Sequence, residues 1–112
     1  MSEGRDKCVL IIDDSATNRA MLKNILKDEV DVIEAENGEK GLEIIRSQIS
    51  RIGIVLLDLI MPGISGFDVL TEMKKEHMTD YVPVIMISTA NDPGNIEKAF
   101  DLGALDFISR PY

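Results

Sequence analysis

Short apolar runs alternate along this chain with segments whose apolar residues recur at helical spacing. Unbroken runs of this length are typical of strands buried on both faces of a parallel sheet, and the intervening segments predict the connecting helices. The strands are predicted at residues 8–13, 30–35, 52–58, 84–88 and 105–109. The second run alternates partly with polar residues, which favours an edge strand. The pattern therefore predicts an open α/β fold.

Four helices are expected in this pattern, and the residues at their ends support them. Ser15 and Ser65 are suited to cap two of them, Asp92 before Pro93 predicts the start of another, and Gly103 predicts its end. Each helix should turn one apolar face toward the sheet. The expected inward residues are Met21, Leu22, Ile25 and Leu26, then Leu42, Ile45 and Ile49, then Phe67, Leu70 and Met73, and finally Ile96, Ala99 and Phe100.

Length and charge limit the classes of protein to consider. A chain of 112 residues suits one domain, and its net charge of −8 argues against direct binding to nucleic acid or to an anionic membrane. The single cysteine, Cys8, stands in an apolar run, which favours a buried thiol, and it has no disulfide partner within the chain. No apolar stretch approaches the roughly 20 residues that span a bilayer, and residues 1–7 lack the apolar region of a signal peptide. A cytoplasmic location is expected, with residues 1–7 as a flexible N-terminus.

Polar residues end three of the predicted strands, and a cation follows the last. Asp13 and Asp14 follow the first run, Asp58 ends the third, Ser88 ends the fourth and Arg110 follows the fifth. The carboxyl ends of parallel strands meet at one sheet edge, where ligands bind in open α/β folds. Carboxylates gathered there suit Mg²⁺, and a hydroxyl and a guanidinium suit a phosphoryl group. The sequence therefore predicts a site for Mg²⁺ and phosphoryl transfer.

A purely structural interpretation exists for some of these residues. Asp13 and Asp14 could cap the first helix or place negative charge at its N-terminus. Asp58 is harder to explain in this way, because Ser65 is available to cap the helix that follows. A hydroxyl such as that of Ser88 is common at strand ends. The combination of these residues, more than any one of them, favours the site.

The same residues resemble those of the receiver domain of two-component response regulators. The resemblance rests on segments 11–15, 56–63 and 83–88 and covers essentially the whole chain without gaps. It implies a flavodoxin-like fold, an open parallel five-stranded sheet in the order 2-1-3-4-5 with helices on both faces. It also implies that a sensor histidine kinase or a histidine phosphotransfer protein donates the phosphoryl group. Such a protein is a phosphoacceptor switch that assists its own phosphorylation and dephosphorylation, and is not otherwise an enzyme.

The resemblance also implies a role for each site residue. Asp58 would accept the phosphoryl group, and Asp14 and Asp58 would bind Mg²⁺ directly with the backbone carbonyl of Ile60. Asp13 would act on the ion through water. Two further roles concern the conformational switch: Ser88 would be the switch hydroxyl and Phe107 the aromatic residue coupled to it. The face formed by the fourth helix and the fifth strand would then control an output domain or a separate target protein.

Two departures from the family pattern are visible. Arg110 stands where the family has a lysine followed by a cis peptide bond, here at Pro111, and we expect Arg110 still to contact the phosphoryl group. The sequence given also ends at Tyr112, before the family's fifth helix. The expectation is therefore one receiver domain over residues 1–112, cut before that helix. It would belong to a longer protein, or would form a homodimer or exchange segments to cover the exposed sheet face.

Two other classes of function fit parts of the pattern. A pseudo-receiver, which binds a partner without being phosphorylated, is suggested by Arg110 and by the absence of a hydroxyl on Phe107. An Mg²⁺-dependent phosphatase would need a second acid near Asp58, but Ile60 stands two residues later and no inserted substrate cap is evident. Residues 91–94 and 102–107 also resemble receivers fused to cyclic-dinucleotide enzymes.

Overall fold

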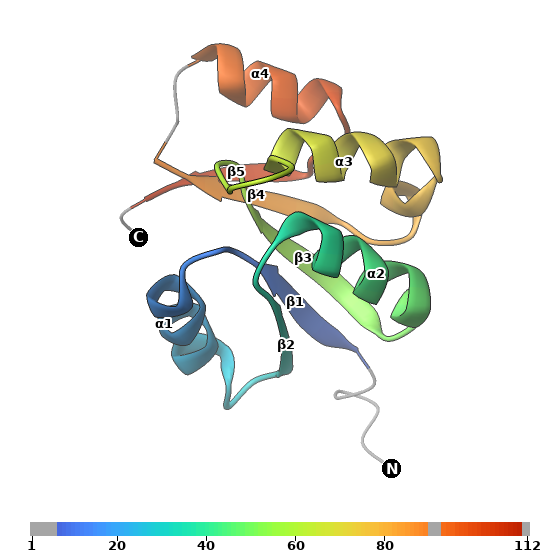
Figure 1. Ribbon diagram of the computed structural model, residues 1–112. Coiled ribbons are helices and arrows are strands. Elements are labelled where there is room, and N and C mark those ends of the chain that lie inside the picture. The colour runs from blue at the N-terminus through green and yellow to red at the C-terminus, as the bar shows by residue number, and fades with distance from the viewer. Residues whose placement is uncertain (1–6, 90–92, 111–112) are drawn as a thin grey trace.

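The computed structural model describes residues 7–89 and 93–110, and its strands and helices alternate along the chain (Figure 1). No helix in these two ranges is long and apolar enough to cross a membrane. The elements are β1 (Cys8–Ile12), α1 (Ala16–Leu26), β2 (Asp31–Ala35), α2 (Gly38–Gln48), β3 (Ile52–Asp58), α3 (Gly66–Lys75), the short 3₁₀ turn η2 (Met78–Asp80), β4 (Val84–Ser88), α4 (Pro93–Asp101) and β5 (Asp106–Ser109).

The five strands form one parallel sheet in the order β2-β1-β3-β4-β5. This order confirms the predicted flavodoxin-like fold, and β2 lies at an edge as its partly polar sequence indicated. The chain reverses its direction of strand addition between β1 and β3, so the loops after these two strands lead to opposite faces of the sheet (Figure 1). Ligands bind beside such a reversal in open α/β sheets.

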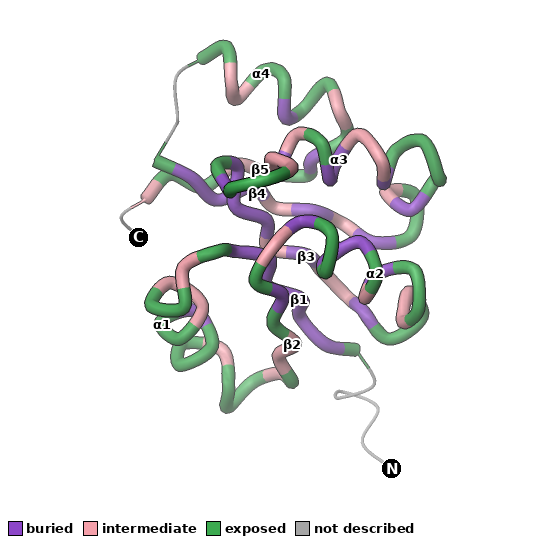
Figure 2. Tube along the Cα trace, in the orientation of Figure 1, coloured by how far each residue is buried: buried purple, intermediate pink, exposed green. Residues whose placement is uncertain are grey.

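The larger core layer lies between the sheet and the helices α2, α3 and α4. It contains alternate residues of β1 together with apolar residues of the three helices, among them Leu10, Ile12, Ile45, Leu70 and Ala99. All five are at most 5% exposed, and Figure 2 shows how buried segments gather along the central strands. Cys8 belongs to the same layer and is buried as predicted. This layer fixes the positions of the strand ends.

The opposite sheet face carries a smaller core and, in the described part of the chain, only α1. Leu22 packs there against Val9, Ile11 and Ile87. The prediction for α1 was partly wrong, because Met21 and Ile25 are 44% and 60% exposed. An isolated helix on a five-stranded sheet has neighbours on too few sides to bury four apolar residues. The sheet face beside α1 is thus less fully covered than the face under α2, α3 and α4.

Apolar side chains are also exposed at the β5 edge of the sheet. Phe100, which the helical pattern placed on the inward stripe of α4, is 46% exposed, and Ile108 of β5 is 39% exposed. Ala99 takes the innermost position of α4 instead. The helical spacing of apolar residues identifies the apolar face of a helix. How much of that face is buried depends on how much of the sheet lies opposite the helix.

Local hydrogen bonds explain where the first and third helices begin. The Ser15 hydroxyl accepts from the Asn18 N–H, and the Ser65 hydroxyl accepts from the Asp68 N–H while Asp68 accepts in return from the Ser65 N–H. These caps confirm two predicted helix starts. Asn37 caps α2 in the same way, because its side-chain oxygen accepts from the Lys40 N–H at 2.8 Å. The predictions for residues 1–6, for Asp92 and for the peptide bond at Pro111 lie outside the described residues.

Candidate functional site

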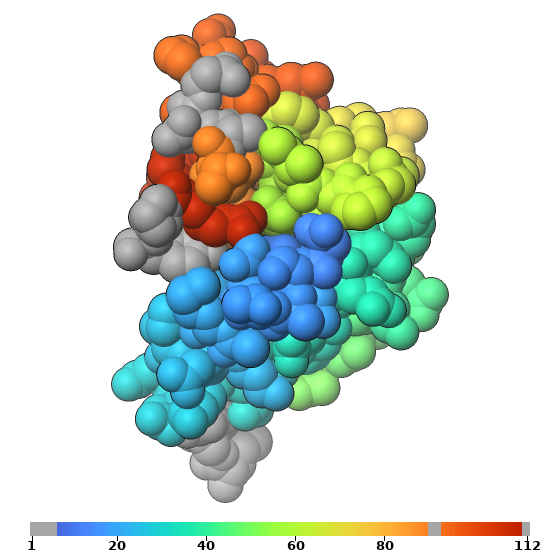
Figure 3. Space-filling view, turned by 60° about the vertical axis from the view of Figure 1, so that its left-hand side comes forward, coloured from blue at the N-terminus to red at the C-terminus, as the bar shows by residue number. Residues whose placement is uncertain are grey.

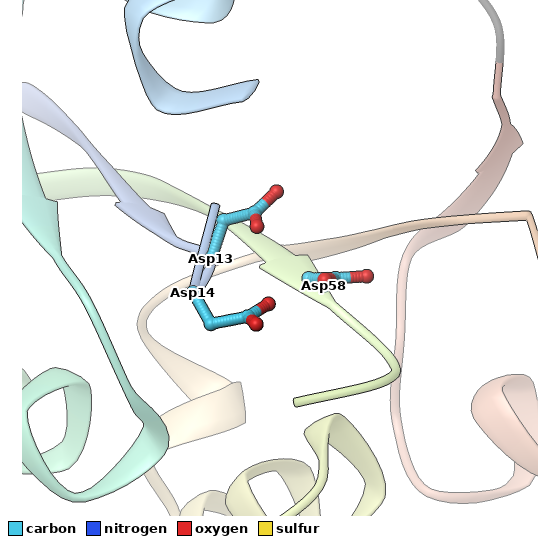
Figure 4. Close-up of side chains that lie close together, drawn as sticks. All are labelled: Asp13, Asp14 and Asp58. Atoms are coloured by element: carbon cyan, nitrogen blue, oxygen red, sulfur yellow. The ribbon is translucent and has the colours of Figure 1, made fainter. Parts of the chain in front are cut away.

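Three carboxylates meet at the carboxyl edge of the sheet. Asp13 and Asp14 follow β1, and Asp58 is the last residue of the neighbouring strand β3. One oxygen from each lies within 4.8 Å of the others, and Figure 4 shows the three side chains directed into the same space. The parallel register causes this convergence, because Ile12 lies opposite Leu57 and the next residue of each strand is an aspartate. The cluster predicted from the strand ends is therefore present.

The two adjacent aspartates after β1 have different environments. Asp13 is buried, its Oδ1 accepts from the Ser15 N–H at 2.8 Å, and its backbone carbonyl accepts from Arg19 Nη1 at 2.7 Å. Asp14 is exposed at the mouth of the cluster. The Asp13 carboxylate is thus fixed by its surroundings, while the Asp14 carboxylate faces solvent and is accessible to an incoming cation.

Arg110 enters the cluster from the end of β5. Its Nη2 donates to Asp58 Oδ1 at 2.6 Å and lies 3.7 Å from Asp13 Oδ2. The arginine side chain is 15% exposed, and the two carboxylate side chains are 4% and 7% exposed. Because these groups are largely withdrawn from water, their attraction is stronger than that of a surface ion pair. Arg110 therefore partly balances the negative charge at the centre of the site.

Asp58 is nevertheless hard to ionise. Burial, followed by repulsion from Asp13, raises its pKa from 3.8 to about 6, against the opposing effects of Arg110 and of a weak hydrogen bond from the Ile60 N–H. A raised pKa shows that the single guanidinium does not fully compensate a carboxylate in this position. Additional positive charge would stabilise the ionised cluster.

The chemistry of the donor set fits a hard divalent cation. Mg²⁺ prefers oxygen ligands, keeps several waters, and needs only a few carboxylates at a partly open site. Asp13, Asp14 and Asp58 provide carboxylate oxygens at suitable mutual distances, with one of the three residues exposed. The excess negative charge around Asp58 favours the same ligand.

The remaining predicted site residues come from neighbouring elements. Ser88 is buried at the end of β4, next to Ile87, which lies opposite Asp58 in the register. Phe107 of β5 is half-buried and packs against the larger core. Ile60 lies two residues beyond Asp58 and is exposed. In Figure 3 the segment after β1, the segment after β3 and the end of β5 lie side by side on one surface. The fold thus places Ser88 and Ile60 beside the aspartate cluster and Phe107 in the core.

Comparison with known proteins identifies the family. The family model of the response regulator receiver domain matches residues 9–112. The chain belongs to this family. A receiver domain from Clostridium thermocellum is 31% identical, with a TM-score of 0.85 over 95% of this chain and 83% of that one. The rice two-component response regulator ORR11 (Oryza sativa subsp. indica) is 30% identical over 104 residues, which are 92% of this chain and 70% of that protein.

A longer relative is similar to this receiver domain in one part only. A Vibrio cholerae serotype O1 protein named "Probable cyclic di-GMP phosphodiesterase" is 34% identical over 103 residues, which are 92% of this chain. The chain spans 23% of the length of that protein. The similarity therefore concerns the receiver portion.

Sequence reasoning missed one neighbour of the receiver site. Arg19 holds the backbone carbonyl of Asp13 and also donates from Nε to Glu34 at 3.1 Å, which ties α1 to β2 beside the cluster. An arginine in the first turn of a helix gives no such signal, because its partner Glu34 is distant in sequence. The ion pair depends on the position of β2 at the sheet edge.

Proposed function

We propose that this receiver domain accepts a phosphoryl group on Asp58 from a phosphohistidine and acts as a switch in a two-component phosphorelay. The observation that supports the proposal is the position of Asp58, buried at the carboxyl edge with two further carboxylates within 4.8 Å and a guanidinium 2.6 Å from its Oδ1. A carboxylate surrounded in this way is placed to act as a nucleophile toward a dianionic group only if positive charge is supplied.

In this proposal Asp14, Asp58 and the backbone carbonyl of Ile60 would hold Mg²⁺ directly, and Asp13 would act on the ion through water. When bound, Mg²⁺ offsets the negative charge that accumulates on the carboxylates and the phosphoryl oxygens. Two features of the site favour binding of the ion in this way. The Ser15 N–H fixes Asp13, and the exposure of Asp14 leaves a path into the site.

The transfer forms one bond and breaks one. An oxygen of the ionised Asp58 carboxylate attacks phosphorus in line with the leaving group, an O–P bond forms, and the P–N bond to the donor histidine breaks. The imidazole leaves with the electron pair of that bond and takes up a proton. Arg110 stabilises charge on the transferred group by a charge-assisted hydrogen bond. The product is an acyl phosphate on Asp58.

The signal then passes to the side of the domain formed by α4 and β5. Ser88 donates its hydroxyl to a phosphoryl oxygen, and its approach changes the space available to Phe107 in the core beneath α4. The phosphorylated protein thus favours a second packing of α4 and β5, a shift between two populations. The exposed surface that includes Phe100 and Leu105 would change with it.

The partners follow from this role. A sensor histidine kinase or a histidine phosphotransfer protein supplies the phosphoryl group in the cytoplasm, and the α4 and β5 surface acts on an output domain of a longer chain or on a separate target. The similarity to part of a cyclic di-GMP phosphodiesterase suggests an output enzyme that acts on a cyclic dinucleotide. The receiver itself would contribute only its own phosphorylation and dephosphorylation.

Intact mass after incubation with acetyl phosphate and Mg²⁺ tests the proposal. We expect the mass of one phosphoryl group to be added to the wild type and nothing to be added to Asp58→Asn or to the wild type in EDTA. Asp101→Asn is the matched control, because it removes the same charge from an exposed residue outside the cluster. It should be phosphorylated as fully as the wild type.

Two rival functions predict different results in this experiment or in an added assay with phosphate monoesters. A pseudo-receiver would gain no mass although the folded chain binds Mg²⁺; the Arg110 to Asp58 ion pair is the feature that favours this rival, because it occupies the acceptor oxygen. A phosphatase would release phosphate continuously from small phosphate monoesters. Mass gain on Asp58 without such turnover would exclude both.

A further inference from the structure

Arg110 uses only part of its hydrogen-bonding capacity in this structure. Its Nη2 is bonded to Asp58 Oδ1 at 2.6 Å, whereas its Nε is fully buried and has no hydrogen-bond partner among the described residues. Buried donors are normally paired, because water cannot replace a missing partner. A buried charged group with one donor unpaired therefore requires an explanation.

The covalent geometry of arginine determines where this donor points. A guanidinium is flat, and its Nε–H and one N–H of Nη2 project side by side from the same edge. The unpaired Nε–H therefore lies on the same guanidinium edge as one of the two N–H groups of Nη2, the atom that donates to Asp58 Oδ1. The backbone of Arg110 is held beside the site, since the Arg110 N–H donates to the Ser88 carbonyl at 3.0 Å.

We propose that the unpaired Nε–H of Arg110 is a phosphoryl-binding donor, so that Arg110 contacts the phosphorylated aspartate with two parallel hydrogen bonds. This inference rests on the function proposed above and specifies how the substitution of arginine for lysine operates. In the unphosphorylated protein the Asp58 carboxylate accepts from Nη2 and not from Nε. A phosphoryl group on Asp58 presents several oxygens on one phosphorus, and two of them match the spacing of the fork.

A lysine at this position would behave differently. An ammonium group carries the same charge but is a single compact centre, so it cannot offer two donors at fixed spacing to two oxygens. Arg110→Lys therefore separates the two contributions. It keeps the positive charge beside the carboxylates and removes the paired donors.

Binding of beryllium trifluoride, a phosphoryl-like group that attaches to carboxylates, tests the inference. Its affinity would be measured in saturating Mg²⁺ by ¹⁹F NMR and calorimetry, and the affinity for Mg²⁺ alone would be measured separately. We expect Arg110→Lys to bind beryllium trifluoride at least about tenfold more weakly than the wild type, since two charge-assisted hydrogen bonds become one. Its affinity for Mg²⁺ alone should stay within about twofold, because the charge is unchanged.

Two further variants complete the experiment. Arg51→Lys is the matched control, because Arg51 lies at the opposite end of β3 from the cluster and its side chain donates to Gln48 Oε1 of the adjacent turn. It should match the wild type in both measurements. Arg110→Ala removes the charge as well, so it should bind Mg²⁺ several-fold more tightly while losing beryllium trifluoride affinity, which also shows that the site remains folded.

The results separate the inference from the proposed function. Equal beryllium trifluoride affinity of Arg110→Lys and the wild type would overturn the two-donor contact and leave phosphorylation of Asp58 intact. A wild type that binds Mg²⁺ but no beryllium trifluoride would instead overturn the proposed function. Selective loss in Arg110→Lys supports both.

Discussion

The backbone N–H of Arg110 donates to the backbone carbonyl of Ser88 at 3.0 Å, where β5 leaves its ladder with β4. The cation and the hydroxyl at the site are therefore carried by two neighbouring strand ends held by the same ladder of hydrogen bonds. Neither residue can move far through its backbone without the other. If phosphorylation of Asp58 draws in Ser88, as proposed, the change would reach the edge strand β5 and α4, which packs beside it.

Removing the Asp58 carboxylate should stabilise the metal-free protein at neutral pH. Burial and Asp13 raise the pKa of Asp58 to about 6, so between about pH 4 and pH 6 the folded state binds more protons than the unfolded state. Stability attributable to this group therefore falls as the pH rises through that window. In EDTA, Asp58→Asn should exceed the wild type by about 1–3 kcal/mol at pH 7.5 in urea denaturation.

The pH dependence distinguishes this cause from a simple gain in packing. The stability difference between Asp58→Asn and the wild type should shrink as the pH falls from 6.5 to 4, because the wild-type carboxyl then becomes neutral. A difference of constant size over this range would contradict the assignment. Saturating Mg²⁺ should also reduce it, since the ion stabilises the ionised wild-type cluster.

The aspartate cluster could be predicted from sequence because each acid ends or follows a strand of the same parallel sheet. Asp13 and Asp58 lie at the carboxyl ends of β1 and β3, and they come together because these two strands are neighbours in the sheet. The contacts of Arg110 could not be predicted in the same way. The unpaired Nε depends on a rotamer and on the depth of β5, which no local pattern encodes.

Two substitutions on α1 test how much of that helix is buried. Leu22 is 8% exposed and belongs to the smaller core, whereas Ile25 on the same helix is 60% exposed. Leu22→Ala should cost about 2–3 kcal/mol in the free energy of unfolding. Ile25→Ala should change it by less than about 0.5 kcal/mol, because little contact is lost and alanine favours the helix.

Urea denaturation of both variants provides the measurement, and the comparison is internal to one helix. A large loss for Ile25→Ala would mean that this side chain is covered in solution. The helical pattern alone could not separate the two residues. It placed them on one apolar face, but the sheet surface opposite α1 is wide enough to bury only part of that face.

His77 occupies a backbone conformation that suits glycine. It follows α3 with φ of 59°, in the left-handed region, and its side chain is 80% exposed with one weak ion-pair contact to Asp80 at 3.7 Å. Because the strain is relieved when Cβ is absent, His77→Gly should raise the free energy of unfolding by about 0.5–1 kcal/mol. Thermal denaturation checks this expectation. Gly103 also has a positive φ, of 104°, and here the addition of a Cβ should have the opposite effect. Gly103→Ala should destabilise the protein by at least about 1 kcal/mol.

Gly66 supports the site through a close approach of two backbone segments. Its N–H donates to the Leu59 carbonyl at 2.8 Å, and a Cβ at this position would meet the carbonyl oxygen of Asp58 and approach the Leu59 Cα to 2.8 Å. These are backbone atoms that cannot rotate away, so Gly66→Ala must displace the segment after β3. We expect a loss of about 1–3 kcal/mol in stability.

The same displacement should weaken Mg²⁺ binding at least about fivefold in a calorimetric titration, because Asp58 and the Ile60 carbonyl belong to the displaced segment. Gly53→Ala is the control: it lies at the other end of β3, where the nearest atom to the new Cβ is Lys7 Cβ at 3.0 Å, a contact relieved by a shift of a few tenths of an ångström far from the cluster. That variant should bind Mg²⁺ as the wild type does. If Gly66→Ala lost stability but kept its Mg²⁺ affinity, the ligands on this segment would have to be independent of its backbone position, and the assignment of the Ile60 carbonyl would fail.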